Sequence, residues 1–114
     1  MLPAGSRLQS PEDFRSTLRL GARGGRRTVV VHVALTGDAR RMAGFAVSKA
    51  VGGAVVRNRV KRRLRAILAT RLDALPEGAS VVVRALPDSA TASFSELEAD
   101  VSGALGTALS KAAR

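Results

Sequence analysis

The stretch from Val51 to Arg65 reads VGGAVVRNRVKRRLR and holds six cations in nine residues, from Arg57 onward, with no acidic residue among them. Like charges one helical turn apart repel each other, so folding alone gives no reason for this density. The usual partner of such a segment is a polyanion outside the protein, most often the phosphate backbone of a nucleic acid. We therefore interpret the stretch as a polyanion-binding helix rather than an ordinary solvated face.

The same stretch predicts a helix with two unlike faces. Gly52 and Gly53 break the preceding segment, and the helix is expected to run from about Ala54 to about Leu75, before Pro76. One stripe at helical spacing is apolar and is expected to face the core: Val56, Val60, Leu64 and Ile67. The remaining arc is cationic, so one helix is predicted to serve both the core and an external partner.

The segments before this helix predict a short helix and two strands. Ser10 followed by Pro11 predicts a helix that ends before Gly21, and residues 21–27 (GARGGRR) are interpreted as a flexible basic turn. The β-branched run 28–36 predicts a strand whose core side is Val29, Val31, Val33 and Leu35. A turn at Gly37-Asp38 and a second strand over about 43–49 follow.

The segments after the basic helix predict one more strand and one more helix. Residues 80–86 (SVVVRAL) read as a strand, and 87–89 as a turn. Ser93 and Glu96 have the spacing of a capping box at the start of the last helix. Its buried edge is expected to be Leu97, Val101, Leu105 and Leu109. The order predicts an α+β fold, a small two-layer sandwich with helices on a mixed sheet.

Length and charge predict a single domain over residues 1–114, with residues 1–6 disordered. The net charge is +10, and it is unevenly placed. Residues 1–71 carry 16 Lys or Arg against three acidic residues, a net of +13, whereas residues 72–114 carry three against six, a net of −3. The basic surface is therefore expected in the first two-thirds, and the last third is interpreted as scaffold.

The composition also excludes several classes of protein. There is no cysteine, and no apolar run approaches the roughly 18 residues that span a bilayer, so we expect a soluble, cytoplasmic protein without a membrane partner. One histidine and scattered acidic residues form no triad, carboxylate pair or metal cluster. We expect no catalytic residue and no protein-held metal in this chain.

Three further side chains are left open between two interpretations. Phe14 and Leu18 lie one helical turn apart, which is typical of a core contact, and His32 on the semi-polar side of a strand is typical of a structural histidine. If the first helix and that strand instead border a groove, the same side chains would form a stacking platform for single-stranded nucleic acid.

The run from Gly44 to Arg65 (GFAVSKAVGGAVVRNRVKRRLR) closely resembles the signature of the bacterial ribonuclease P protein component. The hallmark of that family is a helix containing Arg-Asn-Arg, which follows a strand ending in Ser-Lys-Lys and a Gly-Asn turn. The resemblance extends over nearly the whole chain. It implies an αβββαβα sandwich of the ribosomal protein S5 domain 2-like type, with a left-handed βαβ crossover.

The resemblance also implies a function. The protein would be one subunit of a ribonucleoprotein in which a catalytic RNA, with Mg²⁺ bound mainly by that RNA, removes the 5′ leader from precursor tRNA, with one protein per RNA. The RNA-binding residues would be Arg57, Asn58, Arg59, Lys61, Arg62, Arg65 and Lys49. A cleft for the single-stranded leader would be lined by Phe14, Leu18, His32, Ala46 and Ser48.

The chain departs from the family pattern at several positions. Ala46, Ala50 and Gly53 stand where Ser, Lys and Asn are common, and Leu18 and His32 stand where Phe and Tyr are frequent. Stacking in the cleft is therefore expected to be weaker. Two rival functions from the residues alone are a ribosomal protein or RNA chaperone, and a DNA-binding regulator, although no helix-turn-helix pattern is visible.

Overall fold

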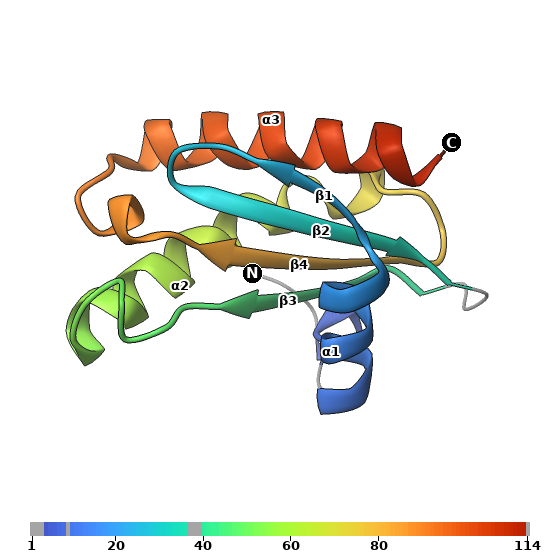
Figure 1. The fold of residues 1–114 in the computed structure, drawn as a ribbon, viewed down its shortest axis with the longest axis horizontal. Coiled ribbons are helices and arrows are strands. Elements are labelled where there is room, and N and C mark those ends of the chain that lie inside the picture. The colour runs from blue at the N-terminus through green and yellow to red at the C-terminus, as the bar shows by residue number, and fades with distance from the viewer. Residues whose placement is uncertain (1–3, 9, 37–39, 114) are drawn as a thin grey trace.

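The computed structural model describes residues 4–8, 10–36 and 40–113 and has the element order αβββαβα (Figure 1). The long elements are α1 (Pro11–Leu20), β1 (Ala22–Gly25), β2 (Val29–Leu35), β3 (Met42–Ala46), α2 (Ala54–Ala69), β4 (Ala79–Ala85) and α3 (Phe94–Ala112). Short 3₁₀ turns are η1 (Ala4–Ser6), η2 (Leu72–Ala74) and η3 (Pro87–Ala90). This order confirms the predicted α+β fold class.

The described strands form one mixed sheet in the order β1-β2-β4-β3. β2 is antiparallel to β1 and to β4, whereas β3 and β4 are parallel and are joined through α2. In Figure 1 both parallel strands point to the left, β4 lies above β3, and α2 returns behind the sheet. The crossover is therefore left-handed, the rare hand for such a connection, as the family resemblance implied.

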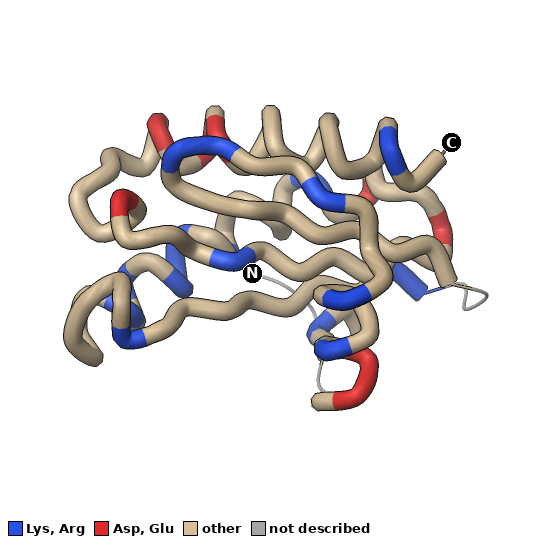
Figure 2. Tube along the Cα trace, viewed as in Figure 1, with Lys and Arg blue, Asp and Glu red and all other residues tan. Residues whose placement is uncertain are grey.

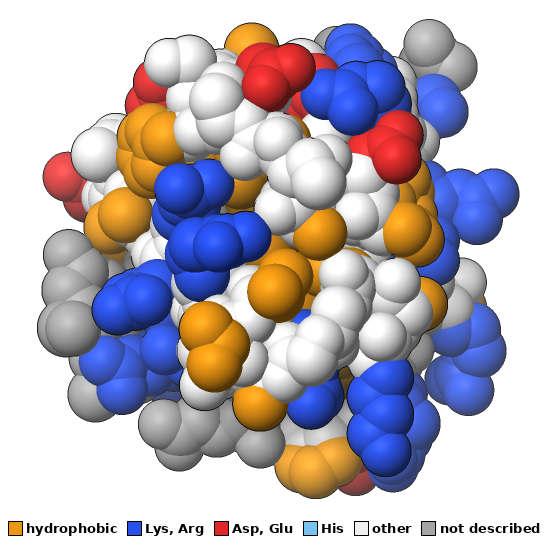
Figure 3. Space-filling model, turned by 90° about the vertical axis from the view of Figure 1, so that its left-hand side faces the viewer, with side chains coloured by type: hydrophobic (Ala, Val, Ile, Leu, Met, Phe, Trp, Pro, Cys, Tyr) orange, Lys and Arg blue, Asp and Glu red, His pale blue; other side chains and the backbone are white. Residues whose placement is uncertain are grey.

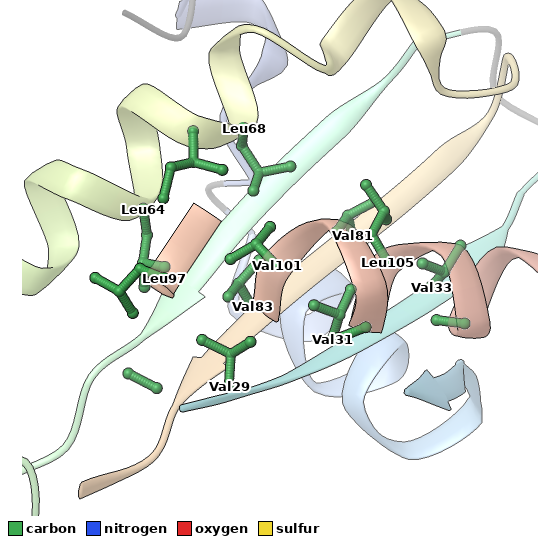
Figure 4. Close-up of a cluster of buried hydrophobic side chains, with 14 of the residues drawn as sticks. Val29, Val31, Val33, Leu64, Leu68, Val81, Val83, Leu97, Val101 and Leu105 are labelled. Carbon is green, nitrogen blue, oxygen red and sulfur yellow. The ribbon is translucent and has the colours of Figure 1, made fainter. Parts of the chain in front are cut away.

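The core lies between one face of the sheet and the helices α2 and α3 (Figure 4). Alternate residues of β2 and β4 point into it, while α2 and α3 each contribute one stripe at helical spacing. Full burial of one such Val or Leu side chain contributes about 1.5–3 kcal/mol, so this layer carries most of the apolar stabilisation. The labelled side chains of Figure 4 are Val29, Val31, Val33, Leu64, Leu68, Val81, Val83, Leu97, Val101 and Leu105.

Both predicted helix starts are confirmed by their caps. The Ser10 hydroxyl accepts a hydrogen bond from the Asp13 backbone N–H at 3.3 Å, which satisfies one free donor of α1. At α3 the capping box is complete, because the Glu96 N–H donates to Ser93 Oγ at 3.1 Å and the Ser93 N–H donates to Glu96 Oε1 at 2.8 Å. The hydrogen bond that the Ser93 backbone N–H donates to the Glu96 carboxylate, together with the Ser93 hydroxyl, lowers the pKa of Glu96.

The interpretation of residues 21–27 as a flexible turn was wrong, because Ala22–Gly25 is the strand β1. It pairs with β2 and lies against α3, where Gly24 is buried. A Cβ at Gly24 would overlap the Ala104 carbonyl oxygen of α3, so glycine allows the close approach. A segment without β-branched residues gives no strand signal, and its pairing is decided by contacts distant in sequence.

Two predicted boundaries and one predicted core residue also differ. The basic helix ends at Ala69 rather than near Leu75, because the Thr70 hydroxyl and the Arg71 guanidinium both donate to the Ile67 carbonyl and close the last turn. The second strand ends at Ala46 instead of continuing to residue 49. Leu35, expected in the core, is 48% exposed at the end of β2. Residues 4–6 form η1, while residues 1–3 and the predicted turn at residues 37–38 lie outside the described residues.

Candidate nucleic-acid interface

The α2 helix carries the predicted basic surface on its outer side. Its buried residues are Val60, Leu64, Ile67 and Leu68, so the polar residues between them are turned away from the core. The helix begins after Gly53 and has no side-chain cap there. Its first backbone N–H groups and its positive dipole end are therefore available to an anion, together with the cationic side chains.

The cations of α2 fall into two groups, and the first is used within the fold. Arg59 Nη2 donates to the Ala90 carbonyl at 2.9 Å, and Arg63 Nη1 donates to the Ala92 carbonyl at 3.2 Å. These contacts attach the segment around η3 to α2. Arg59 was predicted to bind RNA, and that remains a prediction, but one side of its guanidinium already has a structural partner.

The second group faces solvent. Asn58, Lys61, Arg62 and Arg65 line an open hollow of about 440 Å³ together with Val55, which is 80% exposed. Among the described residues, none of these four polar side chains has a hydrogen-bond or ion-pair partner. Unpaired cations that surround an exposed apolar side chain can bind a phosphate backbone and also contact a sugar or base.

The remaining predicted RNA-binding residues flank this group. Arg57 is half-buried in the first turn of α2, and its Nε has no hydrogen-bond partner among the described atoms. Lys49 is exposed in the turn between β3 and α2. The helix α2 and the turn before it therefore carry all seven predicted residues.

The charges are segregated in space as well as in sequence. Figure 2 shows Lys and Arg along α2, whereas the acidic residues of α3 lie at the opposite edge of the sheet, beside the basic turn after β1; α1 carries both signs of charge. Several of those acids are paired: Arg27 bonds Glu96 at 3.1 Å, and Arg71 contacts Glu98 at 3.7 Å. Figure 3 looks at the end where α2 begins and shows basic side chains gathered there around exposed hydrophobic ones.

The predicted leader cleft lies on the face of the sheet opposite the core. Phe14 of α1 lies over Gly44 of β3, since a Cβ at Gly44 would come within 2.9 Å of the Phe14 ring. A hollow of about 210 Å³ extends from there to α2, lined by Arg7, Leu8, Phe14, Phe45, Lys61 and Arg65, among others. The cleft and the basic helix are therefore continuous at the β3 edge of the sheet.

The other predicted cleft residues differ in accessibility. Leu18 and Ala46 are half-buried, and Ser48 is exposed just beyond β3. His32 is only 4% exposed, and among the described atoms neither ring nitrogen has a hydrogen-bond partner. The ring is thus not open to a stacking base unless it turns outward, and the stacking role of His32 stays a prediction.

His32 is surrounded by features that keep it neutral. Burial lowers the pKa of His32, and the nearby positive charges of Arg84 and Arg23 lower it further. The sequence alone does not single out these two arginines, because it predicts a turn over residues 21–27 and scaffold in the last third of the chain. The alternation of β4 would have found Arg84, since Val81 and Val83 face the core and Arg84 must point to the cleft side.

This environment predicts a pH dependence of stability. A histidine whose pKa is lower in the folded state than in the unfolded state contributes stability above the unfolded pKa of about 6.5. That stability is lost as the pH falls from about 6.5 toward the folded pKa. In urea titrations between pH 7.5 and pH 5, His32→Gln should therefore lose less stability on acidification than the parent chain. Parallel losses in both proteins would contradict this account.

Neither a metal-binding cluster nor a membrane-spanning helix is found among the described residues. Within residues 4–8, 10–36 and 40–113, there is no group of three or more His, Cys, Asp or Glu side chains that could hold a metal ion. Over the same residues, no helix combines the length and the hydrophobicity that crossing a membrane requires.

The fold and the charge distribution together define a class of small, basic α+β proteins in which a cationic helix borders a groove on the sheet. A family model described as Ribonuclease P matches residues 2–109. The chain therefore belongs to the ribonuclease P protein family, which places it in tRNA processing as part of a ribonucleoprotein.

Individual relatives agree with this assignment. A ribonuclease P protein component of Kocuria rhizophila is 51% identical over 113 residues, covering 99% of this chain and all of the relative. One of Beutenbergia cavernae is 56% identical over 107 residues, covering 92% of this chain and 89% of the relative.

Solved structures share the fold. A mutant RNase P protein of Staphylococcus aureus superposes with a TM-score of 0.83 at 21% identity, covering 93% of this chain and 88% of that one. The RNase P protein of Thermotoga maritima gives a TM-score of 0.73 at 23% identity, covering 83% of this chain and 90% of the other.

Proposed function

We propose that this chain is the protein subunit that binds the catalytic RNA of ribonuclease P and the 5′ leader of precursor tRNA, whose removal is an endonucleolytic phosphodiester hydrolysis. The observation that carries the proposal is the outer side of α2, where Asn58, Lys61, Arg62 and Arg65 have no partner among the described residues. Such a surface gains nothing from the fold itself and is suited to a folded polyanion.

The two surfaces have separate roles in this proposal. The outer side of α2 and the turn before it contact the catalytic RNA, one protein per RNA. The continuous groove at the β3 edge takes the single-stranded leader, with Phe14 as its aromatic contact. A cationic groove with an aromatic side chain is the usual combination for single strands. The protein acts in the cytoplasm on newly made precursors.

The chemistry is assigned to the RNA partner. The described residues contain no cluster of His, Cys, Asp or Glu side chains that could hold a metal ion. We propose that the Mg²⁺ of the reaction is bound mainly by the RNA, and that the protein raises substrate affinity. His32, the one histidine, is buried and held neutral, which does not suit a general acid.

Reconstitution tests this function. At limiting Mg²⁺, adding the protein to a cognate catalytic RNA should raise kcat/KM for a labelled precursor tRNA by about tenfold or more, equivalent to about 1.4 kcal/mol. The same addition should change the binding of mature tRNA much less. If cleavage did not change and the chain instead sedimented with ribosomes, a ribosomal or chaperone role would replace this one.

A further inference from the structure

Arg84 is a charged residue on a central strand, and its side chain has no partner among the described residues. β4 lies between β2 and β3, and Arg84 is exposed on the face opposite the core. No hydrogen bond or ion pair joins its side chain to any described residue. The four strands contain no Asp or Glu at all. The positive charge on this face is therefore not neutralised by the sheet.

Arg23 adds a second guanidinium on the same face. The register aligns Arg23 with His32, Val82 and Gly44 across the sheet, so these four residues share one side. Arg84 lies in the next row, opposite Val30 and Ala46. With strands about 4.8 Å apart and a rise of about 3.3 Å per residue, the two arginine Cα atoms are about 12 Å apart.

The row of Arg84 is the part of this face that α1 leaves open. Ser80 and Val82, nearer the other end of β4, are buried, and the Ser80 hydroxyl bonds the Thr17 hydroxyl of α1 at 2.7 Å. Arg84 is exposed, whereas its neighbours Val30 and Ala46 are half-buried. A ligand can therefore reach the Arg84 row directly, without displacing α1.

This open row continues the groove already described. Lys61 and Arg65 of α2 share a hollow with Phe14 and Gly44 at the β3 edge. Gly44 is two residues before Ala46, the partner of Arg84 in the sheet. Cations therefore extend from α2, over β3 and β4, to Arg23 on the far edge strand β1.

We propose that Arg84 and Arg23 form a phosphate-binding track across the open face of the sheet, and that this track holds the single-stranded 5′ leader by its backbone. The proposal rests on the proposed function and adds residues and a mode of recognition to it. A planar guanidinium can donate two parallel hydrogen bonds to one phosphate. The ammonium group of lysine is a strongly hydrated point charge and lacks this two-pronged geometry. Between Arg84 and Arg23 base stacking contributes little, because His32 is buried, and the aromatic contact Phe14 lies at the β3 end of the groove.

This mode of binding has a measurable signature. Phosphate contacts release counterions and depend on salt, with a log–log slope of about 0.7 per contact for single strands. Binding through the RNA phosphates also does not depend on the base sequence of the leader. The leader contribution to affinity should thus fall with salt and change little between leaders of different sequence.

The test uses the reconstituted holoenzyme and two tRNA ligands, a precursor with a leader of several nucleotides and the mature tRNA. In Arg84→Gln combined with Arg23→Gln, the salt slope for the precursor should fall by about 1.4, and that for mature tRNA should stay unchanged. Arg84→Lys should keep most of the slope. Arg26→Gln is the matched control, because Arg26 lies against Gly103 and Thr107 of α3 on the core side.

Two results would contradict the proposal that Arg84 and Arg23 form a phosphate-binding track. One is an unchanged precursor slope in the double variant while the parent protein still stimulates cleavage. The other is an equal loss for precursor and mature tRNA, which would indicate weakened assembly with the catalytic RNA. If instead the proposed function were wrong, the parent protein itself would leave cleavage at limiting Mg²⁺ unchanged. This result distinguishes failure of the proposed function from failure of the phosphate-binding track.

Discussion

Replacing Arg62 and Arg65 together with Gln is expected to weaken binding of the cognate catalytic RNA by about 100-fold. Both side chains are exposed on the outer side of α2 and lack partners among the described residues. A hydrogen bond to a charged group contributes about 1.5 kcal/mol or more, so two lost phosphate contacts remove about 3 kcal/mol. The salt dependence should flatten by about 1.4–1.8 in log–log slope.

The stability of the variant protein separates this effect from misfolding. Because neither arginine has a partner among the described residues, the free energy of unfolding in urea should change by less than about 0.5 kcal/mol. The matched control removes two charges elsewhere, through Arg26→Gln with Lys111→Gln on the α3 side. If the control weakened RNA binding as much as the test variant, the general charge of the protein would be responsible, and not the α2 surface.

Arg59 should behave differently from its neighbours. Its bond to the Ala90 carbonyl helps to hold η3 against α2, so removing it affects the fold as well as any RNA contact. The sequence shows Arg57, Arg59 and Arg62 as equivalent cations of one run. Only the position of η3, set by the crossover and by β4, divides them into structural and available groups.

Local signals predicted most of the fold. Helix caps at Ser10 and Ser93, the β-branched runs of β2 and β4, and the apolar stripe of α2 all act within a few residues of chain, and each was confirmed. Signals that act within a few residues of chain cannot predict the site. The groove joins α1, β3 and α2, which only the tertiary fold brings together.

An average charge over a long segment also fails to predict the arginines on the open face of the sheet. The net charge of residues 72–114 is negative and so does not indicate Arg84, although the acidic residues of this segment lie in turns or on α3. An average over a segment hides which face each residue occupies. The alternation of β4 gives the face that Arg84 occupies, but its neighbours Val30 and Ala46 follow only from the register of β4 against β2 and β3.

Replacing Gly24 of the strand β1 with Ala is expected to destabilise the protein strongly. At this position a Cβ would overlap the Ala104 carbonyl oxygen and come within 2.9 Å of Thr107 Cβ, and a helix backbone cannot rotate aside as a side chain can. Forced overlap in a packed site costs about 1–3 kcal/mol, and a rigid neighbour favours the upper end. We expect a loss of about 3 kcal/mol in the free energy of unfolding, measured in urea.

Gly25→Ala is the control for this prediction, because a Cβ there meets only a Val30 methyl at 4.0 Å. It should change stability by less than about 0.5 kcal/mol. Loss of β1 packing should also displace Arg23, so Gly24→Ala should weaken leader-dependent binding even at temperatures where the protein remains folded. Equal stability of the two alanine variants would mean that β1 does not lie against α3 in solution. The sheet would then end at β2, and the face bordered by Arg23 would lose its outer edge.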